Sequence, residues 1–385
     1  MLKQVQHDKT RKSKNKMKSL KVILSGGGTG GHIFPAVAIA NEIKKLVPHA
    51  EILFVGALGK MEMEKVPAAG YKIIGVPIAG LQRKFTLLNF KLPLLVIQSL
   101  LKTQKIINEF KPDVVVGTGG YASGPLLKAA TSKGIPALLQ EQNSYAGITN
   151  KILSKKASKI CVAYEGMEAF FPKEKIILTG NPVRQDILNT NINREEAYRF
   201  FNLDQTKKTV LVIGGSLGAK GINEALVEGL SEFKKQDIQL LWQTGKPYFE
   251  TAKEKANDIH TENIKVVDFI SRMDFAYSVA DVVISRAGAG AISELCIVGK
   301  PSILVPLPTA AEDHQTKNAM SLVSKNAAIL VNESKAKLEL SIQTFLLIND
   351  ENRMREISYN CKSLAKTNST NIIAHEVLKL ANYNL

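Results

Sequence analysis

Long apolar runs are missing from this sequence of 385 residues. The most apolar stretch, LLNFKLPLLVIQSLL at residues 87–101, is interrupted by Lys91 and Pro93, and it is shorter than the roughly 20 residues that a membrane-spanning helix needs. Cysteine is scarce as well, since Cys161, Cys296 and Cys361 lie far apart with neither metal-site nor disulfide spacing. These absences exclude a spanning helix and a disulfide scaffold, and they indicate a reducing compartment.

Signatures of nucleic-acid-binding modules are also absent, although the formal net charge is +16. Residues 1–20 hold seven Lys or Arg and one Asp, and this leader has almost no apolar residue before Leu20. We interpret it as a disordered basic leader and not as a secretion signal, with a misassigned start as the alternative. The chain after residue 20 is only moderately basic. We therefore expect no nucleic acid partner, whereas an anionic membrane surface or a phosphorylated substrate fits the charge.

The sequence does contain a repeated alternation of short apolar runs with helix-length segments. The runs are KVILS, EILFVG, DVVVGTGG and IPALLQE in the first half, and TVLVIGGS, IQLLWQTG, IKVVDFI, DVVISRAG and PSILVPL in the second. Continuous apolar strands separated by helices predict parallel sheets that are covered on both faces. We predict an α/β protein of two doubly wound, Rossmann-like domains facing a central cleft, because ligands bind beyond the carboxyl ends of such strands.

The boundary between the two series falls at the turn marked by Asn181 and Pro182. We predict a leader at 1–20, an N-terminal domain at 21–182, a C-terminal domain at 183–367 and a C-terminal helix at 368–385 that packs back on the N-terminal domain. After Ser334 the pattern is helical to the end of the chain.

The first strand leads into SGGGTGGHIFP, at residues 25–35. Glycines let the backbone approach a ligand closely, and a helix that starts there offers free N–H groups to an anion or a polar ligand. His32 at the helix start feels the positive end of the helix dipole, which lowers its pKa and favours the neutral, proton-accepting form. We predict His32 as a catalytic residue. The alternative is a glycine turn that only permits tight packing.

Three later segments add polar groups at comparable places. IGGSLGAKG presents Ser216 and backbone N–H groups to a diphosphate, and SRAGAGAISEL places Glu294 one turn into a helix, where its carboxylate can accept bonds from ribose hydroxyls. Gln315 and Asn318 share one helix face and suit sugar hydroxyls. A packing turn, an acidic residue at a helix start and an exposed helix face are the respective alternatives.

The motifs GGTGGH, GYASGP, EQNSYAG, TGNPVR, GGSLGA, SRAGA..SE and DHQ..N occur in this order along nearly the whole chain. In this the chain resembles the MurG family, bacterial N-acetylglucosamine transferases that use UDP-N-acetylglucosamine and act on undecaprenyl-pyrophosphoryl-MurNAc-pentapeptide, or lipid I. The resemblance covers about residues 20–370. It implies the two-domain GT-B fold, with the acceptor on the N-terminal domain and most of the nucleotide sugar on the C-terminal one.

The resemblance also implies a set of donor-binding residues. They are Thr29, Gly30, Gly31, Asn143, Arg184, Ser216, Phe269, Ile270, Ala289, Gly290, Ala291, Ile292, Ser293, Glu294, Gln315 and Asn318. Within this set, Arg184 and Ser216 correspond to diphosphate and nucleotide contacts, and Phe269 with Ile270 to a pair that covers the uracil. Glu294 corresponds to the ribose contact. Gly290 departs from members with a larger apolar residue, which puts a side-chain contact there in doubt.

The reaction implied is inverting transfer of N-acetylglucosamine to the C4 hydroxyl of MurNAc in lipid I, which forms lipid II for peptidoglycan synthesis. Many sugar-nucleotide transferases hold a metal with two aspartates in a DxD spacing, but no two aspartates here are two positions apart. We therefore expect no cofactor and no obligatory metal. The resemblance further implies a peripheral location on the cytoplasmic face of the inner membrane, and cell-wall or division proteins as partners.

A segment that alternates apolar and basic residues suits that location. The predicted membrane patch consists of Arg83, Lys84, Phe85, Leu87, Leu88, Phe90 and Lys91. Apolar side chains flanked by cations fit a segment that dips into anionic lipid. The alternative is that the leucines belong to the core of a long helix, and for residues 96–110 we expect core.

Other functions keep the same fold. One is a glycolipid synthase that uses a UDP-sugar, and another is a UDP-N-acetylglucosamine epimerase, although GYASGP and EQNSYAG favour the MurG interpretation. A sugar-nucleotide sensor at the membrane surface and a nucleic-acid binder are the non-enzymatic alternatives. UDP release that depends on the lipid acceptor separates these classes.

Overall fold

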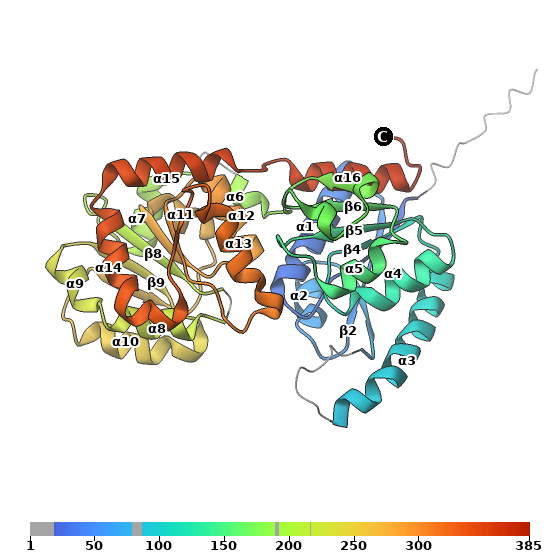
Figure 1. Cartoon of the computed structure of the whole chain (residues 1–385), viewed down its shortest axis with the longest axis horizontal. Coiled ribbons are helices and arrows are strands. Elements are labelled where there is room, and N and C mark those ends of the chain that lie inside the picture. The colour runs from blue at the N-terminus through green and yellow to red at the C-terminus, as the bar shows by residue number, and fades with distance from the viewer. Residues whose placement is uncertain (1–18, 79–86, 189–191, 216) are drawn as a thin grey trace, which may run out of the picture.

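The computed structural model describes residues 19–78, 87–188, 192–215 and 217–385, and it forms two parallel sheets (Figure 1). The first sheet has the strand order β3-β2-β1-β4-β5-β6-β7. Its strands are β1 (Lys21–Ser25), β2 (Glu51–Ala57), β3 (Lys72–Val76), β4 (Val114–Gly117), β5 (Ala137–Glu141), β6 (Lys159–Val162) and β7 (Ile176–Leu178). The order changes direction between β1 and β4, so the turns after these two strands flank the point where open parallel sheets bind ligands.

Helices cover both faces of this sheet. They are α1 (Gly30–Leu46), α2 (Glu62–Ala68), α3 (Leu87–Phe110), α4 (Ser123–Ser132) and α5 (Ile148–Ser154), with 3₁₀ turns η1 (Met167–Ala169) and η2 (Lys173–Lys175). The central strands β4 and β5 are fully buried, and β1 is buried after Lys21, as expected where both faces are covered. Two apolar clusters, one on each face, hold the layers together.

The second sheet has the order β10-β9-β8-β11-β12-β13 and repeats the same plan. Its strands are β8 (Thr209–Ile213), β9 (Gln239–Gln243), β10 (Ile264–Val267), β11 (Val282–Ser285), β12 (Ser302–Leu304) and β13 (Ile329–Leu330). The order changes direction between β8 and β11. The turns after β8 and β11 therefore correspond to those after β1 and β4.

The helices that pack on the second sheet include α12, which directly follows β11. They are α6 (Gln185–Leu188), α7 (Arg194–Phe201), α8 (Lys220–Val227), α9 (Leu230–Lys235), α10 (Phe249–Asn257), α11 (Met273–Val279), α12 (Ala289–Val298), α13 (His314–Val323), α14 (Ala336–Ile348) and α15 (Glu351–Ser363). The 3₁₀ turns are η3 (Lys246–Tyr248), η4 (Ala311–Asp313) and η5 (Glu333–Lys335). Trp242 on β9 is fully buried in the core of this half.

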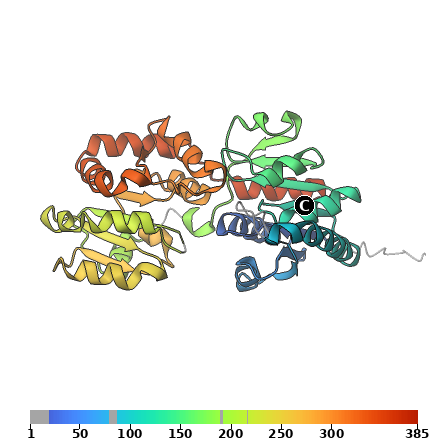
Figure 2. The same cartoon turned by 60° about the horizontal axis from the view of Figure 1, so that its bottom comes forward.

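The chain crosses back to the first half through its last helix, α16 (Ser369–Leu380). In Figures 1 and 2, α15 lies on the C-terminal half and α16 continues over the N-terminal half. Ile373, Ala374, Val377 and Leu378 of α16 belong to the same apolar cluster as β1 and α1. We propose the division of the chain at residues 182/183, with residues 368–385 as a helix attached to the N-terminal half. The separate sheets and this packing support it.

Candidate functional site

The turn after β1 brings the backbone around the ring of His32. Thr29 has an extended backbone and caps α1, and its carbonyl oxygen accepts the N–H of His32 at 3.1 Å. His32 Nδ1 lies 3.2 Å from the carbonyl oxygen of Gly27 and 3.3 Å from Thr29 Oγ1. Because a carbonyl oxygen only accepts hydrogen bonds, this contact favours a proton on Nδ1 and leaves Nε2 of the neutral ring as a proton acceptor.

The surroundings of His32 lower its pKa from the ordinary value. Desolvation of the half-buried ring is the main cause, and His314 on α13 of the other half also lowers the pKa. Glu141, the Gly27 carbonyl and Glu62 act in the opposite direction. The net effect keeps the ring neutral near pH 7, so it can accept a proton. His314 lies on α13 of the other half, so groups from both halves act electrostatically on His32.

The turn after β4 confines the same ring from the other side. A side-chain carbon at Gly119 would lie 3.1 Å from His32 Nε2, and Gly119 has a φ of +98°, which favours glycine. Thr118 Oγ1 donates to the His32 carbonyl oxygen at 2.7 Å. The two turns that flank the change in strand order therefore meet at His32. Thr29, Gly30 and Gly31 lie on its solvent side, half-buried or exposed.

The second half presents the start of α12 at the corresponding place. Gly288 precedes this helix with an extended backbone, and neither Gly288 nor Gly290 has a heavy atom within 4 Å of the position where a side chain would begin. The free N–H groups of the first turn thus border open space, which suits an anionic ligand.

Glu294 lies one turn further along α12 and is already bonded within the protein. Its Oε1 accepts Nε–H of Arg184 at 3.3 Å, and its Oε2 accepts the hydroxyl of Tyr277 at 3.0 Å. Burial raises the pKa of Glu294, while Arg184 and the Tyr277 hydroxyl oppose that rise. Burial also raises the pKa of Tyr277 well above its usual value. Arg184 and Glu294 therefore form one partly buried unit.

The other residues expected along the start of α12 point in different directions, as a helix requires. Ile292 is 2% exposed within the core of this half. Ser293 Oγ donates to the Ala289 carbonyl oxygen at 2.9 Å and accepts Asn181 Nδ2 at 3.0 Å. Gly290 is exposed and Ala291 half-buried.

The pair expected at the uracil divides into an exposed and a buried member. The side chain of Phe269 is 58% exposed, whereas that of Ile270 is 3% exposed and packs in the core. Phe269 is therefore free to stack on a base, and Ile270 can contribute through its main chain only.

Asn143 and Asn318 meet directly between the two halves. Asn318 Nδ2 donates to Asn143 Oδ1 at 3.1 Å, and Asn318 Oδ1 accepts the N–H and the hydroxyl of Ser144 at 2.9 and 3.1 Å. Gln315 Oε1 accepts the N–H of Leu307 at 2.9 Å. The amides of Asn143 and Asn318 thus meet across the halves, whereas that of Gln315 bonds within its own half.

Sequence reasoning missed several residues that complete these arrangements. Tyr277 donates to Glu294, and Asn181 donates to Ser293. Glu141 accepts the N–H groups of Asn143 and Gly147 at 3.1 Å each. Glu141 is the first residue of the EQNSYAG motif. The motif pointed to this segment, but it did not indicate that Glu141 binds its N–H groups. Tyr277 is buried in a helix and carries no signal in its spacing.

Some predicted residues lie outside the described part of the chain. These are Ser216 and the patch residues Arg83, Lys84 and Phe85; Leu87, Leu88, Phe90 and Lys91 begin α3, but only their backbone is described. Further along α3, the expectation of core at residues 96–110 is wrong for one face. Ile106 and Ile107 are buried, but Ile97 and Leu101 are 55% and 62% exposed, because α3 packs on one side only.

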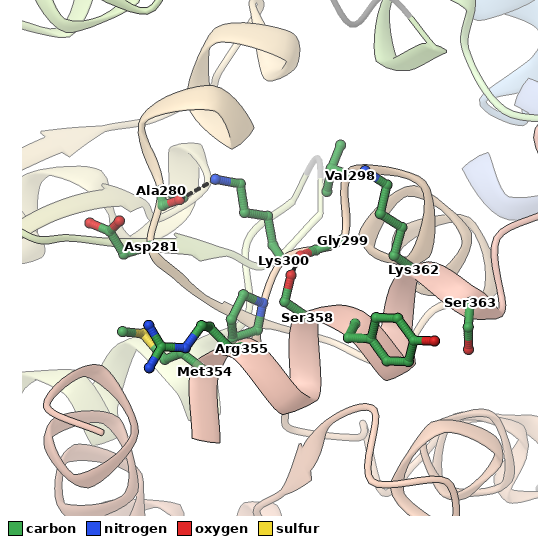
Figure 3. Close-up of a pocket in the computed structure, with 12 residues that line it drawn as sticks. Ala280, Asp281, Val298, Gly299, Lys300, Met354, Arg355, Ser358, Lys362 and Ser363 are labelled. Atoms are coloured by element: carbon green, nitrogen blue, oxygen red, sulfur yellow. Dashed lines mark hydrogen bonds between the residues drawn. The ribbon is translucent and has the colours of Figure 1, made fainter. Parts of the chain in front are cut away.

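Two cavities lie near these elements. One, of about 390 Å³, lies between the halves and is bordered by Ser293, Ser144 and Asn181. The other, of about 820 Å³, lies beside α15 (Figure 3), and no predicted site residue lines it. There Lys300 donates to the Ala280 carbonyl oxygen at 2.5 Å, and burial lowers the pKa of Lys300 to about 8. This second hollow is separate from the site.

Across the ranges described, no cluster of three or more His, Cys, Asp and Glu side chains is arranged to hold a metal ion. In the same ranges, no helix combines the length and apolarity needed to cross a membrane.

Two family patterns match most of the chain. The glycosyltransferase family 28 N-terminal domain matches residues 22–162, and the glycosyltransferase family 28 C-terminal domain matches residues 209–378. Together they include both sheets and the turns described above.

Curated relatives match over nearly their full length. The UDP-N-acetylglucosamine--N-acetylmuramyl-(pentapeptide) pyrophosphoryl-undecaprenol N-acetylglucosamine transferase of Phocaeicola vulgatus is 57% identical over 364 residues, which cover 94% of this chain and 97% of that protein. The protein with the same name from Parabacteroides distasonis is 54% identical, covering 94% of this chain and 99% of that protein.

Solved structures agree with the fold. Acinetobacter baumannii MurG superposes with a TM-score of 0.75 at 30% identity and covers 94% of this chain and 99% of its own. A UDP-GlcNAc 2-epimerase from Neisseria meningitidis reaches 0.64 at 16% identity, covers 94% of this chain and 100% of its own, and shares the fold alone. The two-sheet architecture is the GT-B fold, as predicted, and the chain belongs to the MurG family of glycosyltransferases, within glycosyltransferase family 28.

Proposed function

We propose that this chain transfers N-acetylglucosamine from UDP-N-acetylglucosamine to the C4 hydroxyl of MurNAc in lipid I, which forms lipid II. The relatives' shared name and the family membership support the substrates and the reaction. The observation that carries the proposal is the place of His32, whose ring lies where the turns after β1 and β4 meet, with Nδ1 against the Gly27 carbonyl oxygen. A sugar hydroxyl needs a base at such a place before it can attack.

In the proposed mechanism, Nε2 of His32 accepts the proton of the acceptor hydroxyl. Its Nδ1–H donates to the Gly27 carbonyl oxygen, which fixes the tautomer and the direction of the ring. The hydroxyl oxygen attacks the anomeric carbon, and UDP leaves from the opposite face. This single displacement inverts the anomeric configuration and gives a β-linked product.

For the departing UDP, we propose stabilisation by the free N–H groups at the start of α12 and by Arg184. Arg184 is 40% exposed at its side chain, so it can reach a ligand while it stays beside Glu294. A preorganised cation and helix dipole act on charge that develops in the transition state. These groups take the part that a metal plays in transferases with a DxD pair, which this sequence lacks, so the proposal includes no obligatory metal.

We place the sugar of the donor near Asn143, Gln315 and Asn318, and the uracil on Phe269. Because Asn143 and Asn318 bond to each other, donor hydroxyls that bind there replace this contact or use the remaining polar atoms of the two amides. Glu294 accepts ribose hydroxyls with lone pairs that Arg184 and Tyr277 do not use.

Release of UDP from UDP-N-acetylglucosamine, measured with and without lipid I, tests this function. We expect release only when lipid I is present, together with a product that carries both sugars. Release without acceptor would indicate hydrolysis, and formation of the 2-epimer would indicate the epimerase alternative. Transfer to diacylglycerol in place of lipid I would indicate a glycolipid synthase.

We also propose peripheral association with the cytoplasmic face of the inner membrane through α3. Leu94, Ile97 and Leu101 form one helical face that is 55% to 62% exposed, and Lys105 next to it is 78% exposed at its side chain. Such a face, flanked by cations, suits anionic lipid. Contacts with cell-wall or division proteins stay a prediction.

Sedimentation with vesicles tests the membrane contact. Serine at Leu94, Ile97 and Leu101 should reduce binding to anionic vesicles, and charge reversal at Arg83, Lys84 and Lys91 should do the same, while UDP affinity stays unchanged. Serine at Leu338, Ile342 and Leu346, an exposed apolar face on α14, is the matched control and should leave vesicle binding unchanged. Equal binding of wild type to neutral and anionic vesicles would contradict the electrostatic part.

A further inference from the structure

A buried carboxylate lies directly beneath the first glycine turn. Glu62, the first residue of α2, is 0% exposed. Its Oε2 accepts the N–H of Gly28 at 3.1 Å, and its Oε1 accepts the N–H of Ala57, at the end of β2, at 3.0 Å. One side chain therefore ties the turn after β1 to the end of the neighbouring strand.

Two glycines make the room for this side chain. A side-chain carbon at Gly27 would collide with Glu62 Oε1, and one at Gly56 would lie 2.6 Å from Glu62 Cγ. Among the described lysines and arginines none forms an ion pair with Glu62, so its charge is compensated by backbone N–H groups. Burial of a charge is costly. The two N–H groups that Glu62 accepts offset part of that cost and fix the turn after β1 to the end of β2.

The turn held by Glu62 is the one that orients His32. Gly27, packed against the carboxylate, supplies the carbonyl oxygen that lies 3.2 Å from His32 Nδ1, and the N–H of Gly28 donates to Glu62. The charged and titratable groups that act on the ring are Glu141 on β5, His314 on α13 and Glu62 itself. Glu62 is the one that also bonds to the turn.

We infer that Glu62 is a positioning residue for the transfer: it holds the turn that contains the Gly27 carbonyl, and with it the His32 ring, in the orientation that proton removal needs. Glu62 also acts electrostatically to raise the pKa of His32, against the lowering by burial. This inference rests on the proposed role of His32 as the base. The reacting atoms do not touch Glu62, so its effect passes through His32.

Glu62→Gln is the main test, because it removes the charge and keeps the shape. With lipid I and UDP-N-acetylglucosamine, we expect kcat to fall about 10- to 100-fold, as for a small misplacement of a catalytic group. We expect the affinity for UDP to stay unchanged. In a His32→Ala background the same substitution should cost almost nothing more, because both act on one step. Glu42→Gln is the matched control: Glu42 is a buried glutamate on α1 that bonds to Asn371 and should leave kcat unchanged.

The pKa of His32, followed by NMR in the protein without substrates, gives a readout that does not depend on activity. Loss of the Glu62 carboxylate in Glu62→Gln should lower the pKa of His32. The acid limb of the profile of kcat against pH should then move to lower pH by the same amount. If Glu62→Gln does not fold, Glu62→Asp carries the test, with a reduced kcat and an acid limb close to that of wild type.

If Glu62→Gln lowers kcat equally in the wild-type and His32→Ala backgrounds, or leaves the pKa of His32 unchanged, the inference is overturned. Glu62 then has a structural role only. Absence of acceptor-dependent UDP release in the wild type contradicts the proposed function instead. The NMR result then still decides whether Glu62 sets the state of His32.

Discussion

The glycine turns after β1 and β8 occupy equivalent places in the two sheets, and they differ in what surrounds them. The turn after β1 contacts side chains: Glu62 bonds to Gly28, and the His32 ring lies against Gly27. The turn after β8 contacts mainly backbone. Gly218 has a φ of +76° and lies where a side chain would collide with the Thr244 carbonyl oxygen, and Gly215 accepts Gln243 Nε2 at 2.8 Å.

This difference fits the two tasks that we propose for the βα turns. In the first half, the backbone of the turn orients His32, the proposed base. In the second half, where backbone surrounds it, the turn offers N–H groups, and the titratable group of that half, Glu294, lies on α12 after the neighbouring strand β11. We therefore expect substitutions of His32, at the turn after β1, to change turnover, and those of Glu294, on α12, to change donor binding.

The largest effect should follow His32→Ala. Loss of a general base costs about 10²- to 10⁴-fold in rate, so kcat with lipid I should fall in that range while UDP affinity, measured by calorimetry, stays the same. Because burial lowers the pKa of His32, the acid limb of the wild-type pH profile should lie below the ordinary histidine value, since the ring must be neutral to act. Normal turnover with weakened UDP binding would assign His32 to the donor and remove the contrast between the turns.

Glu294→Ala should have the next largest effect, and on the donor. It removes the proposed ribose contacts, leaves the buried Tyr277 hydroxyl without its acceptor and leaves Arg184 with Asp186 alone. The efficiency with UDP-N-acetylglucosamine should therefore fall roughly 30- to 1000-fold, or about 2–4 kcal/mol. Tyr277→Phe, which keeps the ring and removes one hydrogen bond, should cost about 10-fold or less. Wild-type efficiency of Glu294→Ala would contradict the assignment of the ribose contact.

Asn318→Ala should separate a sugar contact from a contact between the halves. If the amide holds N-acetylglucosamine, the affinity for the complete donor should fall about 5- to 30-fold while that for UDP is unchanged, as for one or two hydrogen bonds. Asn143→Ala, which removes the partner of the same amide, should show the same selectivity. Equal losses for UDP and UDP-N-acetylglucosamine would make the pair a bridge between the halves with no part in sugar recognition.

The sequence could predict the central strands, because runs such as KVILS and TVLVI are apolar throughout and lie between helix-length segments. It did not predict β3, β6, β7 and β13, which are short or half-buried and so give a weak local pattern. The outer strand β10 could be predicted, because Ile264, Val266 and Val267 make it largely apolar. A short strand depends on its neighbours more than on its own pattern.

The candidate site shows the same division. His32 could be found because it directly follows a glycine turn in the sequence. Glu294 could be found because it lies one turn into a helix that follows another glycine turn. Glu62 and Tyr277 act on these residues from 30 and 17 positions away, by counting along the chain. Only the fold brings Glu62 to His32 and Tyr277 to Glu294, so no spacing in the sequence predicts these contacts.

The smallest effect should follow Gly290→Ala, and it tests whether the glycines of the second half serve the ligand or the backbone. No heavy atom lies within 4 Å of the new side-chain carbon, and Gly290 stands inside α12 with an ordinary helical neighbourhood. Alanine should therefore raise the free energy of unfolding by about 0.5–1 kcal/mol, through its greater helix propensity, with UDP affinity changed little. Gly218→Ala is the contrasting variant, because a positive φ and a collision with the Thr244 carbonyl oxygen should destabilise the fold clearly. Urea unfolding and calorimetry with UDP measure both quantities. A Gly290→Ala protein that is more stable but has lost most of its UDP affinity would show that the nucleotide lies against α12 at this point, and that this glycine is kept for the ligand.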